Sequence, residues 1–363
     1  MAIAKKSLKI KGRQLIFKSA LELTWKQFTS TTSIHGLKNT SDSRGTIKTR
    51  ITWATITIIC FICAIILMKT FLMRYKSNPT RINLKTSFGQ INEIEFPAVT
   101  FCNPNFMTLS RIKVLQDSLE IPSSLEDLSD SDIFRFIKYT AGFTNFITDF
   151  NESELPQLQE LMQQNRYDVA LTMKKLMYPC STLLYRCRWE GKFIDCEKLF
   201  SISETYQGFC CSFNILKTSI ISPMTQKKHY RIRNTEFFGP DMGLSVVLNP
   251  QIEKYAMTSI NSEGMEILIN HPNLFPSRSA IRRMLPHKQE TFVEVRPERT
   301  DCSQAVRTLA ISDRGCVFDN EHELRFFPTY KEENCYVECF MQLHIDTCGC
   351  LPYFYYNTEN VPI

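Results

Sequence analysis

The chain has 363 residues and a formal net charge of +6, and its basic residues are concentrated at one end. Residues 1–50 carry 11 Lys and Arg against two acidic residues, whereas residues 51–363 carry 32 basic and 35 acidic residues. A folded nucleic-acid-binding domain spreads Lys and Arg over one face, so a basic tail joined to a near-neutral body argues against a nucleic-acid partner.

The first predicted element is a membrane-spanning helix over residues 51–73. Residues 51–68 contain no charged side chain in 18 positions, and Lys69 alone interrupts the apolar run before Arg74. At about 1.5 Å per residue this segment reaches about 34 Å, enough to cross a hydrocarbon core of about 30 Å. The alternatives are a buried helix of a soluble protein, which normally keeps a polar face, and a cleaved signal peptide, which would lie nearer the N-terminus.

The charges beside the span predict its orientation. Arg44, Lys48 and Arg50 lie immediately before it, so the positive-inside rule predicts a cytoplasmic segment 1–50 and an exterior domain 74–363. None of the 14 cysteines lies in residues 1–50, two lie in the span and 12 follow it. An even number of cysteines outside the cell predicts disulfides.

Beyond the span, the pattern predicts an α+β body. Residues 90–96 alternate with period two and predict a half-buried strand, which resumes at residues 99–101. Residues 122–178 have a helical period and predict an insertion of helices, one capped by Asp132 and the next carrying Pro156 in its first turn. Further strands are predicted at residues 209–213, 244–248, 265–269 and 291–295.

One more helix is predicted over about residues 329–346. Thr329 and Glu332 have the spacing of a capping box, so the helix should begin near Thr329. Cys335 and Cys339 are four residues apart and would lie on one face. Separately, Asn151 begins an Asn-Glu-Ser sequon and is a candidate glycosylation site.

No local motif of a known catalytic type occurs, and we expect neither an enzyme nor a cofactor. One cluster has the residue types of a zinc site: Cys335, Cys339, His344, Cys348 and Cys350. Zinc modules usually use CxxC-type knuckles in reducing compartments, so disulfide bonding is the favoured interpretation on the predicted exterior.

Three motifs surround the predicted span in a fixed order: Ser33–Leu37 (SIHGL) before it, Phe96–Asn103 (FPAVTFCN) after it, and Gly208–Asn214 (GFCCSFN) about a hundred residues later. In this order they resemble the epithelial sodium channel/degenerin family, most closely its insect pickpocket branch. The resemblance extends through the cluster at residues 335–352 and covers the chain from about residue 20.

The resemblance implies a subunit of a trimeric, amiloride-sensitive sodium channel in the plasma membrane, with two spans and both termini inside the cell. Its implied partners are sodium ions, the lipid bilayer and related subunits. His35 and Gly36 match the family's cytoplasmic gating motif, and the helix near residue 329 matches its thumb.

The resemblance also implies disulfides. Cys102 is expected to pair with Cys210 across a loop of about a hundred residues, and Cys187 with Cys196.

Two departures from the family pattern stand out. Arg299-Thr300-Asp301 precedes Cys302 where acid-sensing relatives carry Trp, which argues against proton gating.

The second departure is that no further run of 18 apolar residues follows Met73. The family's pore-lining second span is therefore missing from this sequence, as are most partners of the cysteines at 335–350. We expect a fragment or short form of a sodium-channel subunit. The alternatives are a non-conducting regulatory or dominant-negative channel partner and a single-pass receptor or adhesion protein.

Overall fold

The computed structural model describes residues 2–42, 45–140, 151–216, 232–258, 260, 262–356, 361 and 362. The chain divides into two units. Residues 1–83 with 302–316 form one, here called the helical unit, and residues 84–301 with 317–363 form the other, here called the sheet unit. Arg44, one of the three basic residues expected beside the span, lies outside the described residues.

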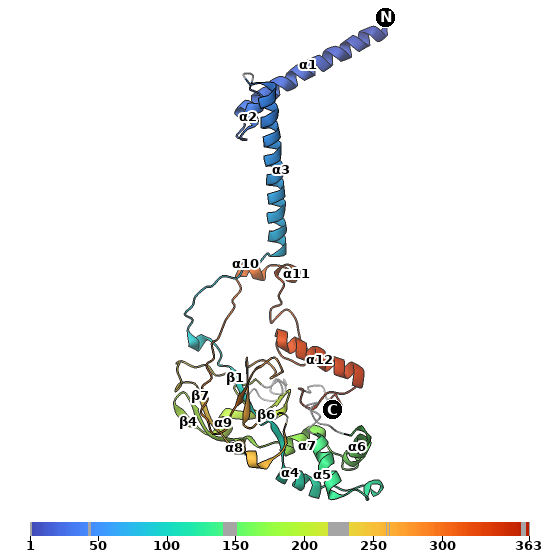
Figure 1. Ribbon diagram of the computed structural model, residues 1–363, viewed down its shortest axis with the longest axis vertical. Coiled ribbons are helices and arrows are strands. Elements are labelled where there is room, and N and C mark those ends of the chain that lie inside the picture. The colour runs from blue at the N-terminus through green and yellow to red at the C-terminus, as the bar shows by residue number, and fades with distance from the viewer. Residues whose placement is uncertain are drawn as a thin grey trace. The chain divides into compact units, whose positions relative to one another are not determined.

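The helical unit contains α1 (Ala2–Thr31), α2 (Leu37–Thr40) and α3 (Ile47–Ser77), with the short helices α10 (Gln304–Arg307) and α11 (Ile311–Arg314) (Figure 1). The predicted span 51–73 lies inside α3, which begins where the Thr46 side chain accepts a hydrogen bond from the Thr49 backbone N–H. Within the described residues, α3 alone is long and apolar enough to cross a membrane, and none of its apolar window is buried.

The sheet unit is built on a five-stranded antiparallel sheet in the order β10-β9-β1-β6-β5. Its strands are β1 (Ala98–Cys102), β5 (Phe200–Thr205), β6 (Gly208–Phe213), β9 (Met265–Asn270) and β10 (Ile281–Leu285). Every residue of β1 is buried, because this apolar and β-branched strand lies at the centre. Its Thr100 is opposite Ser212 on one side and Leu268 on the other.

The sheet unit also contains two smaller antiparallel sheets. β2 (Asn105–Thr108) pairs with β8 (Tyr255–Thr258), and the other sheet has the order β4-β3-β7, with β3 at Leu184–Trp189, β4 at Lys192–Ile194 and β7 at Leu244–Leu248. The main core lies between the five-stranded and three-stranded sheets, where Trp189 packs against Phe213 and other buried side chains.

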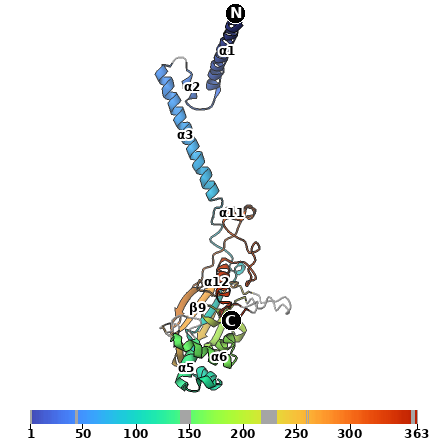
Figure 2. The same cartoon turned by 90° about the vertical axis from the view of Figure 1, so that its right-hand side faces the viewer.

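The helices of the sheet unit are α4 (Leu109–Asp117), α5 (Asp130–Tyr139), α6 (Leu155–Gln164), α7 (Val169–Leu176), α8 (Cys180–Leu183), α9 (Cys196–Leu199) and α12 (Glu332–Cys348). α4 to α7 share a second core around Phe136 and Leu161, and Figure 2 shows α5 and α6 side by side. α12 packs its Val337 and Met341 into a third core with Phe275 and Phe326.

Four local predictions were wrong. Residues 91–93 form a short 3-10 helix, and the extended chain resumes only at Glu95, which bridges Asn234. Residues 291–295 have no strand partner among the described residues, although their β-branched side chains favour extended backbone.

The other two errors concern helix caps. α5 is capped by Ser129, whose backbone N–H donates to Asp132 in return, so Asp132 is the third residue of a capping box and not the cap. α12 begins at Glu332 after Lys331, and the Thr329 hydroxyl is buried without a hydrogen-bond partner in place of capping the helix. The helical insertion also begins earlier than expected, with α4 at residue 109.

Candidate functional site

The His-Gly pair lies in a turn that contacts the membrane helix. Gly36 has φ +86°, a left-handed conformation that glycine adopts without strain, and it forms the N-cap of α2. A Cβ atom at Gly36 would lie 3.0 Å from Thr57 Oγ1 and 3.3 Å from Trp53 Cε3, both on α3. The backbone of Gly36 therefore rests directly on one face of the span.

His35 behaves differently from its neighbour. Its side chain is exposed, whereas Gly36 is half-buried. The Thr57 hydroxyl donates to the Trp53 carbonyl oxygen at 2.8 Å. Thr57 Oγ1, the polar atom nearest Gly36, therefore has its hydrogen-bond partner within α3. The close approach of this turn to α3 therefore depends on the absence of a side chain at position 36.

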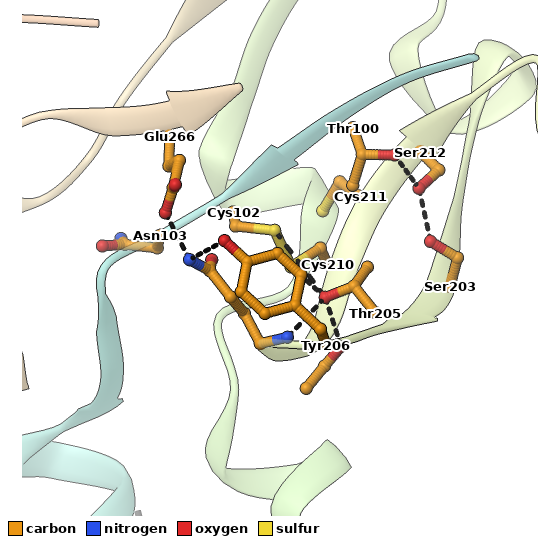
Figure 3. The surroundings of a disulfide bond; sticks show 12 residues. Thr100, Cys102, Asn103, Ser203, Thr205, Tyr206, Cys210, Cys211, Ser212 and Glu266 are labelled. Atoms are coloured by element: carbon orange, nitrogen blue, oxygen red, sulfur yellow. Dashed lines mark hydrogen bonds between the residues drawn. A yellow bond between two sulfur atoms is a disulfide. The ribbon is translucent and has the colours of Figure 1, made fainter. Parts of the chain in front are cut away.

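Three disulfides hold the sheet unit together. Cys102 is joined to Cys210, and Cys187 to Cys196, which are the two pairs expected from the resemblance. Cys180 is joined to Cys211, a pair that was not predicted from the sequence. Figure 3 shows the first of these bonds linking β1 to β6. Successive side chains of a strand point to opposite faces, so the adjacent cysteines Cys210 and Cys211 of β6 have partners on opposite sides of the sheet. The Cys-Cys pair in a predicted strand was therefore a signal in the sequence for a second disulfide at this strand.

A buried polar cluster surrounds the first disulfide (Figure 3). Thr205 Oγ1 accepts a hydrogen bond from the Gln207 backbone N–H at 3.1 Å, donates to the Gly208 carbonyl oxygen at 2.9 Å and lies 3.3 Å from Cys210 Sγ. Two residues along each strand from this disulfide, the hydroxyls of Thr100 on β1 and Ser212 on β6 lie 2.6 Å apart. These contacts provide hydrogen-bond partners for buried polar groups of the β5–β6 turn and of the neighbouring strands.

Glu266 is a carboxylate buried within this sheet, with 3% of its surface exposed. It accepts a hydrogen bond from Gln207 Nε2 and forms an ion pair with Arg282, whose Nε lies 2.9 Å from Glu266 Oε1. Arg282 also donates to the Tyr206 hydroxyl at 3.1 Å, and burial raises the pKa of Tyr206. A charge network therefore links β9, β10 and the β5–β6 turn, and nothing in the sequence alone predicts it.

A second charged site lies between the end of β9 and the start of α12. His271 Nε2 is 3.2 Å from Glu95 Oε2, and His271 Nδ1 accepts the Asn273 backbone N–H at 3.2 Å. That acceptor role keeps the proton on Nε2. Burial lowers the pKa of His271, and Glu95 opposes this shift. The other charges acting on the imidazole come from Lys331, Glu333 and Asp319.

Asn334, in the first turns of α12, ties the helix to the loop after β9. Its Oδ1 accepts the Phe275 backbone N–H at 3.0 Å, and its Nδ2 donates to the Asn273 carbonyl oxygen at 2.9 Å. The side chain is fully buried. A lone asparagine in a helix pattern carries no sequence signal for this role, because both partners lie about 60 residues away.

The remaining predicted cysteines stay unpaired in the structure: Cys335, Cys339, Cys348 and Cys350. Cys60, Cys63, Cys302 and Cys316 are also free. Across the described part of the chain, no three His, Cys, Asp or Glu side chains converge to hold a metal ion, so the zinc-like spacing near residue 344 does not assemble a site there.

Asn151, the sequon residue, is exposed. Its Oδ1 accepts a hydrogen bond from the Ser153 hydroxyl at 2.8 Å, so the two residues that a glycosylation site requires are already in contact.

These features define a class: a membrane protein whose described part has one candidate spanning helix, joined to a disulfide-rich unit of mixed helix and sheet. Residues 28–363 match the family model described as amiloride-sensitive sodium channel. The chain therefore belongs to the amiloride-sensitive sodium channel family, which confirms the resemblance inferred from the three motifs. This is a family of channels, not of enzymes.

Individual relatives agree with the family match. The chain is 32% identical over 349 residues to sodium channel protein Nach of Drosophila melanogaster, covering 93% of this chain and 65% of that protein. It is 24% identical to pickpocket protein 28 of the same species, with 93% and 57% covered, and 23% identical to the human bile acid-sensitive ion channel, with 90% and 58% covered. The chain thus spans somewhat less than two thirds of the length of these relatives.

Proposed function

We propose that this chain supplies the first membrane span, the cytoplasmic gating segment and the extracellular domain of a sodium-channel subunit. In this proposal residues 1–50 are cytoplasmic, the sheet unit is extracellular, and the subunit acts in the plasma membrane as a trimer with related subunits. The complete channel passes sodium ions down their gradient.

The observation that carries the proposal is the contact of Gly36 with Trp53 and Thr57 of α3. A turn held against the span can transmit a change in the cytoplasmic segment to a pore helix, because a glycine contact leaves no flexible side chain between the two backbones. A receptor or adhesion anchor has no need of such a contact.

The disulfides and the sequon support the proposed orientation. Disulfides persist in oxidising surroundings, and all three join residues of the sheet unit. The exposed sequon at Asn151 belongs to the same unit. Lys48 and Arg50, which lie in α3 just before its apolar run, favour the cytoplasmic side for the opposite end of the span.

Co-expression tests the proposal. The 363-residue chain, tagged at its N-terminus, is expressed in oocytes with a full-length subunit of the same family, and amiloride-sensitive sodium current and co-purification are both measured. Co-assembly should appear as joint purification together with a changed current. A chain that reaches the surface, yet neither co-purifies with the subunit nor alters its current, would rule the proposal out.

A further inference from the structure

An open hollow lies on the three-stranded sheet, lined by residues of β3, β4 and the short helices α8 and α9, which both contact β3. Its volume of about 480 Å³ falls in the range of roughly 300–1,000 Å³ that small-ligand sites occupy. The Cys187–Cys196 disulfide joins β3 to α9 at this hollow, and both cysteines are buried. These cross-linked walls restrict the motion of the site, which lowers the entropic cost of binding a ligand.

Arg186 is the cation of the hollow, and its guanidinium is stacked on an aromatic ring. Its Cζ lies 3.9 Å from the centroid of the Phe193 ring on β4. Among the residues that the structure describes, no carboxylate forms an ion pair with Arg186, whereas Arg188 on the same strand is paired with Asp241 at 2.7 Å. Stacking covers one face of a guanidinium and leaves its N–H edges available, and these edges bind a carboxylate through two parallel hydrogen bonds.

Two aromatic side chains beside Arg186 supply an apolar surface. Tyr185 is 79% exposed and Phe193 is 63% exposed, and both line the hollow. The register of β3 against β7 shifts between Leu184 and Arg186, so Tyr185 is the extra residue of a β-bulge. A bulge re-aims side chains, and here it places an aromatic ring and an arginine next to each other on one hollow.

Two acidic residues of the hollow limit what it can bind. Asp195 Oδ1 accepts a hydrogen bond from the Glu197 backbone N–H at 3.1 Å, so this carboxylate caps α9. The Glu197 side chain is exposed and also lines the hollow. One arginine beside two carboxylates disfavours a ligand with several negative charges, such as a phosphate or a sulfated glycan. A single carboxylate on an apolar body fits the arginine and the aromatic rings with the least repulsion.

From these observations we infer that the hollow at Arg186 binds an organic monocarboxylate with an apolar or aromatic body. The carboxylate accepts hydrogen bonds from the N–H edge of Arg186, and the apolar body lies against Tyr185 and Phe193. A free small molecule or an acidic residue of a neighbouring protein chain can supply this carboxylate, and the recognition chemistry is the same for both. Binding at this site does not depend on the proposed channel function.

Fluorine NMR of para-fluorophenylacetate tests the site, with the 363-residue chain in lipid nanodiscs and empty discs as the blank. This probe is a monocarboxylate with an aromatic body, and para-fluorophenylacetamide is its neutral match. We expect saturable broadening of the carboxylate signal. The amide should bind about tenfold more weakly or worse, because a hydrogen bond to a charged group is worth at least about that factor.

A matched pair of arginine variants shows whether Arg186 holds the carboxylate. Both side chains belong to β3, and only Arg186 lines the hollow. Arg186→Gln should weaken probe binding about tenfold or more. Arg188→Gln should stay within about twofold of wild type, because Arg188 is already paired with Asp241 and lies outside the hollow.

Three further variants test the apolar surface and the acidic wall. Phe193→Ala should weaken binding about two- to tenfold, because the ring contacts both the probe and Arg186. Val247→Ala should match wild type, since Val247 is equally exposed on the same sheet and does not line the hollow. Glu197→Gln should strengthen binding about two- to fivefold, because it removes a like charge.

Complexes co-purified with a full-length related subunit show which source supplies the carboxylate. Probe binding that is retained in these complexes indicates a free small molecule. Probe binding that is lost there indicates that the neighbouring chain occupies the hollow, and Arg186→Gln should then also weaken co-purification.

The site is ruled out if the chain broadens the probe signal no more than empty discs do, or if the amide binds as well as the carboxylate. Equal effects of Arg186→Gln and Arg188→Gln would also rule it out. None of these measurements uses sodium current, so the proposed channel function is judged separately by its own experiment.

Discussion

Removing the three disulfides one at a time should destabilise the sheet unit in the order of their loop lengths. The cysteines of each pair are changed together to alanine, so that no lone thiol remains. The separations are 108 residues for Cys102–Cys210, 31 for Cys180–Cys211 and 9 for Cys187–Cys196. In the chain-entropy model these loops are worth about 4.8, 3.7 and 2.6 kcal/mol respectively.

Packing losses should not change this order. Five of the six cysteines are buried and Cys180 is partly buried, and each double substitution removes two sulfur atoms from similar surroundings. The steps of about 1 kcal/mol between variants therefore come mainly from the unfolded chain.

Denaturant unfolding of the full chain in detergent measures the losses. Trp189 is the reporter, because its ring lies 4.7 Å from the Phe96 ring and 4.9 Å from the Phe213 ring in the main core. Emission should shift at lower denaturant in each variant, most for the pair with the longest loop. Equal losses, or the greatest loss for Cys187 and Cys196, would refute the loop-entropy reasoning.

Three further predictions concern single positions. Gly264→Ala should destabilise the sheet unit by about 3 kcal/mol or more in the same unfolding assay, since φ is +130° and a Cβ would lie 2.1 Å from the Leu285 carbonyl oxygen. Asn151→Gln should remove one glycan, seen as a gel shift that endoglycosidase treatment of wild type reproduces; an unchanged mobility would argue against an extracellular sheet unit. Because burial lowers the pKa of His271, the unfolded chain binds its proton more readily, so stability should fall as the pH drops below about 6.5. His271→Gln should flatten that fall in thermal melts, whereas a profile identical to wild type would mean that Glu95 offsets the burial.

A matched glycine tests the first of these. At Gly89 an added Cβ meets nothing within 4 Å, so Gly89→Ala should change stability by no more than about 0.5 kcal/mol. A large effect there would show that the unfolding assay responds to something other than the steric clash expected at Gly264.

The features that sequence predicts well are those that depend on neighbours along the chain. Hydrophobicity over residues 51–68 is a local property, so the span was predictable to within a few residues of α3. Three of the four strands expected between residues 209 and 295 form, because each has apolar residues that a neighbouring strand can cover. The fourth, at 291–295, has a similar composition and no partner among the described residues.

The features that sequence misses depend on contacts across long separations. Asn334 reaches the loop after β9, and Glu266 pairs with Arg282 across two strands. Each is an ordinary polar residue that becomes buried only through the pairing and register of distant strands, which the local sequence does not indicate. Gly36 was identified by resemblance, and the structure adds the reason for a glycine, which is the close approach to Trp53 and Thr57.

Single-channel recording of the co-assembled channel tests whether the Gly36 turn takes part in gating. An alanine at position 36 strains a backbone with φ +86° by about 1–2 kcal/mol, which shifts an open–closed equilibrium about 5–30-fold if the turn forms in only one state. We expect Gly36→Ala to change the open probability by such a factor while the number of surface complexes stays the same, and we expect Gly89→Ala records to match wild type. Equal open probabilities for all three chains in co-purifying complexes would show that the Gly36 turn has no role in gating.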